Sequence, residues 1–128
     1  MSNLILDTCG LIWLVNKGGE LSKHTLISIQ KAEIVYVSAA TALEIGCKVA
    51  LGKLELPMHP NDWYSEAIEQ HDIVEIAIDG QTGLQSASLP MIHKDPADRI
   101  IIATAKLKNL PVVTHDRRFE EYGVKVLK

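Results

Sequence analysis

Short apolar runs alternate with amphipathic stretches along almost the whole chain, and this alternation constrains the fold most strongly. The apolar runs lie at residues 4–6, 34–37, 73–77, 111–114 and 124–127. Between them, apolar residues recur at helical spacing. Strands that alternate with helices favour an α/β domain with a central, mostly parallel sheet of about five strands. The 128 residues suit a single domain, 1–128, that can bury a sizeable core.

Helix boundaries are predicted from capping residues, glycines and prolines. Ser38 is a predicted N-cap, and Asn61 or Asp62 is predicted to cap the helix before the third strand. A glycine pair at 18–19 is predicted to stop the first helix. The predicted helices span residues 8–15, 22–31, 39–52, 63–71, 80 to about 90, and 96–109.

The stretch from residue 91 to residue 105 predicts a loop that leads into a buried helix. Asp95 stands at the N-cap position, Pro96 at the first helical position and Asp98 in the first turn. A carboxylate is favoured there because the helix dipole is positive at its N-terminus. The residues that follow, 100–105, are almost all apolar, which predicts burial. An acidic group is thus expected at the start of a rigid interior helix.

Charge and cysteine content narrow the classes of function. Lys and Arg number 13 against 16 Asp and Glu, so the net charge is −3 and binding of nucleic acid by bulk positive charge is disfavoured. A nuclease with a bound cation stays possible. Cys9 and Cys47 form no Cys-x-x-Cys pair, so no zinc site is predicted. Residues 1–7 carry no export signal and no run suffices for a membrane span, so a cytoplasmic protein is expected.

Acidic residues from distant segments are predicted to meet at one edge of the sheet. Asp7 ends the first strand and Asp116 follows the fourth, and sites in parallel sheets form at the carboxyl ends of strands. Asp98 begins a helix, and helix starts usually share the edge at which the preceding strand ends. Glu44 lies six residues into its helix, about 9 Å along at 1.5 Å per residue, so its long side chain can reach back.

Each acid also has a purely structural interpretation. Asp7 and Asp98 can cap helices, Glu44 can pair with Lys48 at the i,i+4 spacing, and Asp116 suits a turn. Four acids on one edge favour a site instead. Clustered carboxylates repel one another, and a hard divalent cation such as Mg²⁺ or Mn²⁺ relieves that repulsion. Such a site is suited to metal-assisted hydrolysis of phosphate esters.

The motifs, taken in order, resemble those of the PIN domain family, and most closely the VapC-type ribonuclease toxins of bacterial toxin–antitoxin modules. The matching fragments are Leu-Ile-Leu-Asp7-Thr8, Ser38 to Glu44 with Gly52-Lys53-Leu54, His93-x-Asp95-Pro96-x-Asp98-Arg99, and Val113-Thr114-x-Asp116-x-x-Phe119. Together they cover essentially the whole chain. The resemblance implies a three-layer α/β sandwich and an endoribonuclease that depends on Mg²⁺ or Mn²⁺.

The resemblance also implies roles for individual residues. The catalytic quartet would be Asp7, Glu44, Asp98 and Asp116, and Thr114 would support it. Three of these, Asp7, Asp98 and Asp116, would hold the metal directly or through water, and Glu44 would complete the site or orient water. Homodimers, an RNA substrate and an antitoxin peptide laid across the acidic groove are implied as well. Ala97 departs from the family, whose members often have an aromatic residue there.

Basic residues beside the acids are candidates for binding RNA phosphates. They are Arg99, Arg117 and Arg118, with Lys94 nearby, and a solvated charged face is the alternative for each.

Two histidines and a tryptophan near the acids have alternative interpretations. His93 could assist proton transfer or stack on a base, but an ordering role in its loop is favoured. His115 could act similarly, but an incidental position without a role is favoured. Trp13 suits either the core or a groove that binds a partner helix through apolar anchors.

Two other functions compete with a ribonuclease toxin. One is an RNA-processing nuclease of the same fold that has no antitoxin. The other is a non-catalytic interaction domain, which the four carboxylates disfavour.

Overall fold

The computed structural model describes residues 3–128, and five parallel strands form one sheet in the order β3-β2-β1-β4-β5. Met1 and Ser2, part of the start that carries no predicted export signal, lie outside the described residues. The elements are β1 (Leu4–Leu6), α1 (Thr8–Asn16), α2 (Lys23–Lys31), β2 (Val35–Ser38), α3 (Ala39–Ala50), α4 (Pro60–Gln70), β3 (Ile73–Ile76), α5 (Gly80–Ser88), α6 (Pro96–Lys108), β4 (Val112–Val113), the 3₁₀ helix η1 (Arg117–Tyr122) and β5 (Val126–Leu127).

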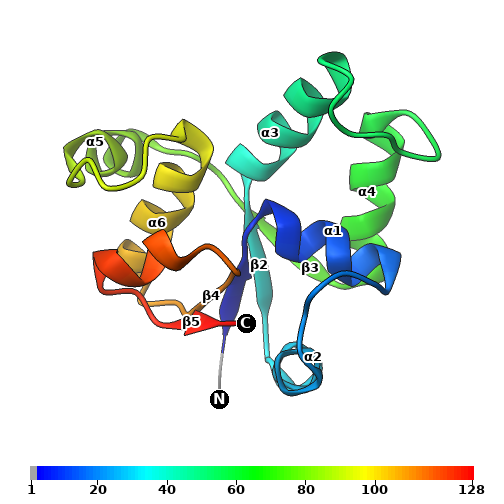
Figure 1. Cartoon of the computed structure of the whole chain (residues 1–128), viewed down its shortest axis with the longest axis horizontal. Helices are drawn as coiled ribbons and strands as arrows, with labels where there is room; N and C mark the ends of the chain where they lie inside the picture. Colours follow the sequence, from blue (N-terminus) through cyan, green and yellow to red (C-terminus); the bar gives the residue numbers. More distant parts are fainter. Residues whose placement is uncertain (1–2) are drawn as a thin grey trace.

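Helices cover both faces of the sheet, which makes three layers. In Figure 1, α1 to α4 lie on one side of the strands, and α5, α6 and η1 lie on the other. The side chains of β1 alternate between the two faces: Leu4 and Leu6 join the core under α1 to α4, and Ile5 joins the core under α6 and η1. The predicted α/β sandwich with a parallel sheet is thus confirmed.

The register of the central strands brings their carboxyl ends level. Leu6 of β1 pairs with Val37 of β2 on one side and with Val113 of β4 on the other. The next residue, Asp7, donates its backbone N–H to the Val113 carbonyl at 3.1 Å. The residues that follow β1, β2 and β4 therefore lie next to one another at one edge.

Caps fix the ends of the two helices that matter most for this edge. The Ser38 hydroxyl accepts from the Ala40 N–H at 3.0 Å, as predicted for the N-cap of α3. The Asp95 carboxylate accepts from the Asp98 N–H at 3.1 Å, as predicted for α6. Residues 101–105 in α6 are buried, so the helix is held firmly in the interior.

Two local predictions were wrong. The helix before the third strand begins at Pro60, because the His59 ring nitrogen caps it by accepting from the Asn61 N–H; neither Asn61 nor Asp62 is the cap. The first helix ends where Lys17 adopts a left-handed conformation (φ 54°), just before the glycine pair predicted to stop it.

The 3₁₀ helix after Asp116 was not predicted. Among the helices of residues 3–128, none is long and apolar enough to cross a bilayer.

Candidate active site

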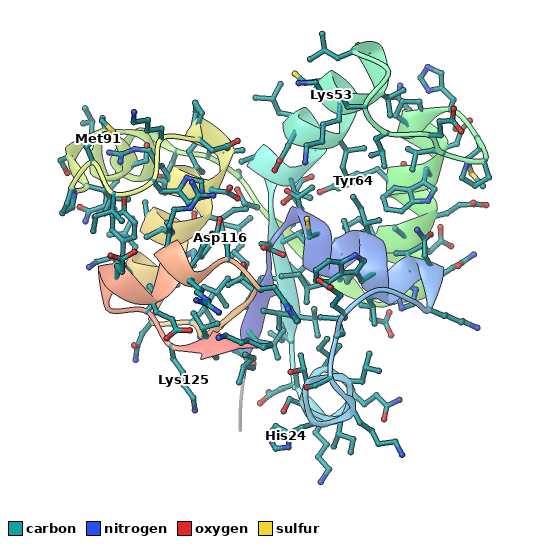
Figure 2. All side chains as sticks on the ribbon, in the orientation of Figure 1. His24, Lys53, Tyr64, Met91, Asp116 and Lys125 are labelled. Atoms are coloured by element: carbon teal, nitrogen blue, oxygen red, sulfur yellow. The ribbon has the colours of Figure 1, made fainter. Side chains whose placement is uncertain are left out.

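Four acids from four separate segments line one pocket at the carboxyl edge of the sheet. The pocket has a volume of about 400 Å³, and Asp7, Glu44, Asp98 and Asp116 all line it. Figure 2 shows Asp116 in the space between α1 on one side and α6 with η1 on the other. The remaining lining residues are Thr8, Cys9, Trp13, Lys48, His93, Asp95, His115 and Arg118. The predicted quartet is therefore brought together in space.

Asp7 is held rigidly because it ends β1 and also caps α1. Its Oδ1 accepts from the Gly10 N–H at 2.7 Å, and only 6% of the residue is exposed. A side chain at position 10 would place its Cβ 3.1 Å from both Asp7 Oδ1 and the Val113 carbonyl, so it would crowd the carboxylate and the end of β4. Burial raises the pKa of Asp7, although hydrogen bonds from Thr114 and Gly10 oppose the rise.

Asp98 is strongly perturbed by its surroundings. It lies in the first turn of α6, where the buried helix fixes its position. Burial, followed by repulsion from Glu44, Asp95, Asp7 and Asp116, raises the pKa of Asp98 to about 7. Acids forced together in this way indicate a site for positive charge.

Asp116 is held in its ionised form. It caps η1 by accepting from the Arg118 N–H at 3.0 Å. The Arg118 guanidinium binds both carboxylate oxygens, at 3.0 Å through Nε and 2.8 Å through Nη2. This pairing lowers the pKa of Asp116 to about 2. Thr114, which is fully buried, lies between two acids: its hydroxyl accepts from the Asp116 N–H at 3.0 Å and hydrogen-bonds to Asp7.

Glu44 is fixed by neighbours on both sides. The Thr8 hydroxyl donates to Glu44 Oε1 at 2.6 Å, and Thr8 in turn contacts the Thr41 hydroxyl at 3.2 Å. Lys48 pairs with Glu44 Oε2 at 3.0 Å. The i,i+4 ion pair therefore exists, but it lies in the wall of the pocket, so the structural and the functional interpretation of Glu44 are compatible.

His93 has a closer relation to the acids than the sequence indicated. Its ring is 2% exposed, and Nε2 lies 3.0 Å from Asp98 Oδ2 and 3.0 Å from Asp116 Oδ2. The expected ordering of its loop is also present, since His93 Nδ1 accepts from the Asp95 N–H at 3.2 Å. The sequence could not show the contact with Asp116, because it depends on where the unpredicted helix η1 begins.

Arg99 does not fit the expectation that it contacts RNA. Its side chain is buried and donates to the backbone carbonyls of the loop before α6, including those of Leu89 at 2.8 Å, Pro90 at 3.0 Å and His93 at 3.0 Å. These bonds explain the burial of a charged group, because they replace its lost hydration. Arg99 thus shapes the loop that carries His93.

The other basic candidates remain accessible. Arg117, Arg118 and Lys94 are exposed, and of these Arg118 lines the acidic pocket.

The aromatic residues divide between core and pocket. Trp63 is buried in the core, whereas Trp13 lines the pocket and meets His115 edge-on with ring centroids 5.2 Å apart.

The pocket has the chemistry of a divalent-cation site. Carboxylate oxygens, which hard cations prefer, make up most of its possible ligands. Within the described chain, one carboxylate oxygen of Asp98, one of Asp116 and one ring nitrogen of His93 lie within 4.8 Å of one another. Burial, and after it repulsion from neighbouring acids, raises the pKa of both Asp7 and Asp98, and a bound cation would offset both effects. The residues present therefore fit Mg²⁺ or Mn²⁺.

Comparison with known proteins identifies the family of this chain. Ribonuclease VapC22 of Mycobacterium tuberculosis is 25% identical over 123 residues, which cover 95% of this chain and 93% of that protein. DNA-bound VapBC from Salmonella typhimurium has a similar fold, with a TM-score of 0.71 and 20% identity over 98% of this chain and 97% of that chain. A toxin–antitoxin complex from Klebsiella pneumoniae has a TM-score of 0.67 with 19% identity, and the match covers 98% and 96% of the two chains. The family described as PIN domain matches residues 4–125, nearly the whole length, and the chain therefore belongs to the PIN domain family.

Proposed function

We propose that this PIN domain is a metal-dependent endoribonuclease that hydrolyses phosphodiester bonds in RNA and acts as the toxin of a toxin–antitoxin pair. The observation that carries the proposal is the convergence of Asp7, Glu44, Asp98 and Asp116 in one pocket, with the pKa of Asp98 raised to about 7. The name of the relative from M. tuberculosis supports RNA as the substrate. The toxin–antitoxin complex of K. pneumoniae supports the biological role.

Three carboxylates would hold the cation. In this assignment Asp7, Asp98 and Asp116 bind Mg²⁺ or Mn²⁺, and Glu44 completes the site or orients the attacking water. When bound, such a cation supplies charge neutralisation at the phosphate and makes water a better nucleophile. Thr114 supports the arrangement by linking Asp7 and Asp116.

The chain's own residues prepare this site in different ways. The Gly10 N–H fixes the direction of the Asp7 carboxylate, and Thr8 fixes that of Glu44. Asp116 is ionised at neutral pH, as an ordinary aspartate is, and Arg118 extends its ionisation to lower pH by lowering its pKa to about 2. Asp98, whose pKa is raised to about 7, must lose its proton before it can serve as a ligand. The buried walls keep these positions constant, so little reorganisation accompanies the reaction.

Substrate and partner would approach from the exposed side of the pocket. Arg118 at the rim, with Arg117 beside it, is placed to contact RNA phosphates. An antitoxin segment would lay an apolar helix face against Trp13 and place a basic side chain among the acids. We also propose a homodimer, as the family resemblance implies, and a cytoplasmic location, where RNA is available.

The test is cleavage of RNA by the purified chain with Mg²⁺ or Mn²⁺. Cleavage should stop on addition of EDTA and return when the metal is restored. Asp7→Asn should abolish cleavage and keep the wild-type circular dichroism spectrum, whereas Asp62→Asn, the same change at an exposed site on α4, should cleave normally. Cleavage that persists in EDTA would refute metal dependence, and absence of cleavage would favour a non-catalytic domain.

The toxin role needs a separate test in cells. Induction of the chain should arrest growth, the Asp7→Asn variant should not, and co-expression of the small protein encoded beside it should restore growth. A chain that cleaves RNA but never arrests growth would instead be a processing nuclease.

A further inference from the structure

His93 lies in the interior between two acids that belong to different elements. Its Nε2 is 3.0 Å from Oδ2 of Asp98, in the first turn of α6, and 3.0 Å from Oδ2 of Asp116, at the start of η1. Among the described residues, it is the one side chain with a polar contact to both acids. The geometry of the Asp116 contact is that of a hydrogen bond. A single ring atom therefore contacts both carboxylates.

The other ring nitrogen determines which atom carries the proton. Nδ1 accepts from the backbone N–H of Asp95 at 3.2 Å, so Nδ1 bears no hydrogen. A histidine ring always carries at least one N–H, so the proton is on Nε2, the atom that faces Asp98 and Asp116. In this tautomer Nε2 is a donor and has no lone pair to give to a cation.

The backbone of His93 is anchored on both sides, and its ring is packed. The Tyr122 hydroxyl accepts from the His93 N–H at 2.7 Å and donates to the Pro90 carbonyl at 2.7 Å. Arg99 donates to the His93 carbonyl at 3.0 Å. The ring itself meets the buried Phe119 edge-on, with centroids 5.9 Å apart. Loop, helix α6 and helix η1 are thus joined at this residue.

We propose that His93 is a positioning residue of the cation site. Its Nε2–H holds Asp98 and Asp116 at a fixed spacing and leaves their remaining oxygens to the metal, while the ring itself stays outside the set of ligands. Outer groups that orient ligands typically contribute 10- to 100-fold to metal affinity or activity. This inference rests on the proposed function, because it concerns the Mg²⁺ or Mn²⁺ ion that the proposed ribonuclease needs.

Two substitutions separate the contact with the acids from the contact with the loop. In His93→Gln the amide nitrogen replaces Nε2, so a donor still faces the acids, but the acceptor for the Asp95 N–H is lost. In His93→Asn the side-chain oxygen replaces Nδ1 and keeps the bond to the N–H two residues on, as Asn commonly does in turns, but nothing reaches the acids. Both variants lose the ring that packs on Phe119, so they are matched for the change in packing.

The first measurement is the affinity of the full chain for Mn²⁺ without RNA, detected by electron paramagnetic resonance. The second is the pair of constants kcat and KM for RNA cleavage. We expect His93→Asn to bind Mn²⁺ about 10- to 100-fold more weakly and to lose kcat rather than KM. His93→Gln should stay within about threefold of wild type, in line with the donor it retains. Equal losses in both variants, or normal binding by His93→Asn, would overturn the proposal. A wild-type chain that neither binds Mn²⁺ nor cleaves RNA would instead refute the proposed function.

A measurement on the wild-type chain serves if either variant fails to fold. Long-range ¹H–¹⁵N correlation spectra distinguish the two tautomers of a histidine ring. We expect His93 to carry its proton on Nε2 both in EDTA and with saturating Mg²⁺. A proton on Nδ1, or loss of the Nε2 proton when Mg²⁺ is added, would show that the ring binds the cation and would overturn the proposal.

Discussion

Replacement of Asp98 by asparagine should make the metal-free protein more stable at alkaline pH. Burial and repulsion by neighbouring acids raise the pKa of Asp98 from 3.8 to about 7. At about 1.36 kcal/mol per pKa unit, this shift of about three units destabilises the folded chain by about 4 kcal/mol when Asp98 is ionised. An asparagine carries no charge but bears a burial cost of about 1–3 kcal/mol for its amide. We therefore expect a net gain of about 2 kcal/mol in the free energy of unfolding.

The gain in the free energy of unfolding from Asp98→Asn depends on pH. Because the pKa of Asp98 is higher in the folded state, its stabilising contribution is present below pH 4 and is lost as the pH rises through 7. The gain from Asp98→Asn should therefore be largest at pH 8 and should shrink by more than half at pH 5. Mg²⁺ should reverse the order at pH 8, because a cation that binds only the folded wild-type site stabilises it.

Urea unfolding of both proteins, followed by circular dichroism in EDTA at pH 5 and pH 8, measures the difference. The exposed change Asp62→Asn, on α4, controls for the loss of one negative charge from the whole chain. An Asp98→Asn variant that is no more stable than wild type at pH 8 in EDTA would show that the acids do not repel one another as the geometry requires.

Four further predictions concern single residues. Asp7→Asn should abolish Mg²⁺-dependent RNA cleavage in a gel assay without loss of helical circular dichroism, and wild-type cleavage would exclude Asp7 from the site. Arg99→Lys should lower the free energy of unfolding by about 2–4 kcal/mol in urea, because an ammonium cannot serve the several carbonyls bound by the guanidinium; an unchanged midpoint would contradict this. Arg118→Ala should raise the pKa of Asp116 from about 2 toward 3.8 in an NMR titration, since the guanidinium is the main cause of its depression. Trp13→Ala should weaken co-purification with the antitoxin while the melting temperature falls little, and unchanged affinity would remove Trp13 from that interface.

The order of strands and helices could be predicted from the sequence because periodicity reports burial directly. The three-residue run Leu4–Leu6 is apolar throughout since β1 is central and covered on both faces. The start of α4 was mispredicted because a histidine cap looks like a loop residue, whereas Asn61 and Asp62 look like caps. The short helix η1 was missed because its pattern, charged apart from Phe119 and Tyr122, spans too few residues to show a period.

Asp7 and Asp116 could be placed together because strand ends share an edge, a rule that needs only the order of elements. Asp98 was added from the start of its helix, and Glu44 from the reach of its side chain. The role of Arg99 could not be predicted in this way. Its guanidinium is satisfied by carbonyls that converge only when the loop after α5 folds back over the start of α6. In the amino-acid sequence alone, an arginine beside an acid looks the same whether it binds phosphate or supports a loop.

Repulsion among the acids opposes the arrangement on which the pocket depends. A fold that holds the buried Asp7 and the partly buried Asp98 in one acidic pocket is destabilised when they ionise, because the pKa of each is raised. Left to relax, such side chains would turn outward into water. Gly10 and His93 oppose this, because the Gly10 N–H bonds the Asp7 carboxylate and His93 Nε2 lies 3.0 Å from Asp98 Oδ2. Asp95 fixes the start of α6 through the backbone N–H of Asp98. The repulsion therefore persists in the folded chain, and its relief would favour binding of a cation.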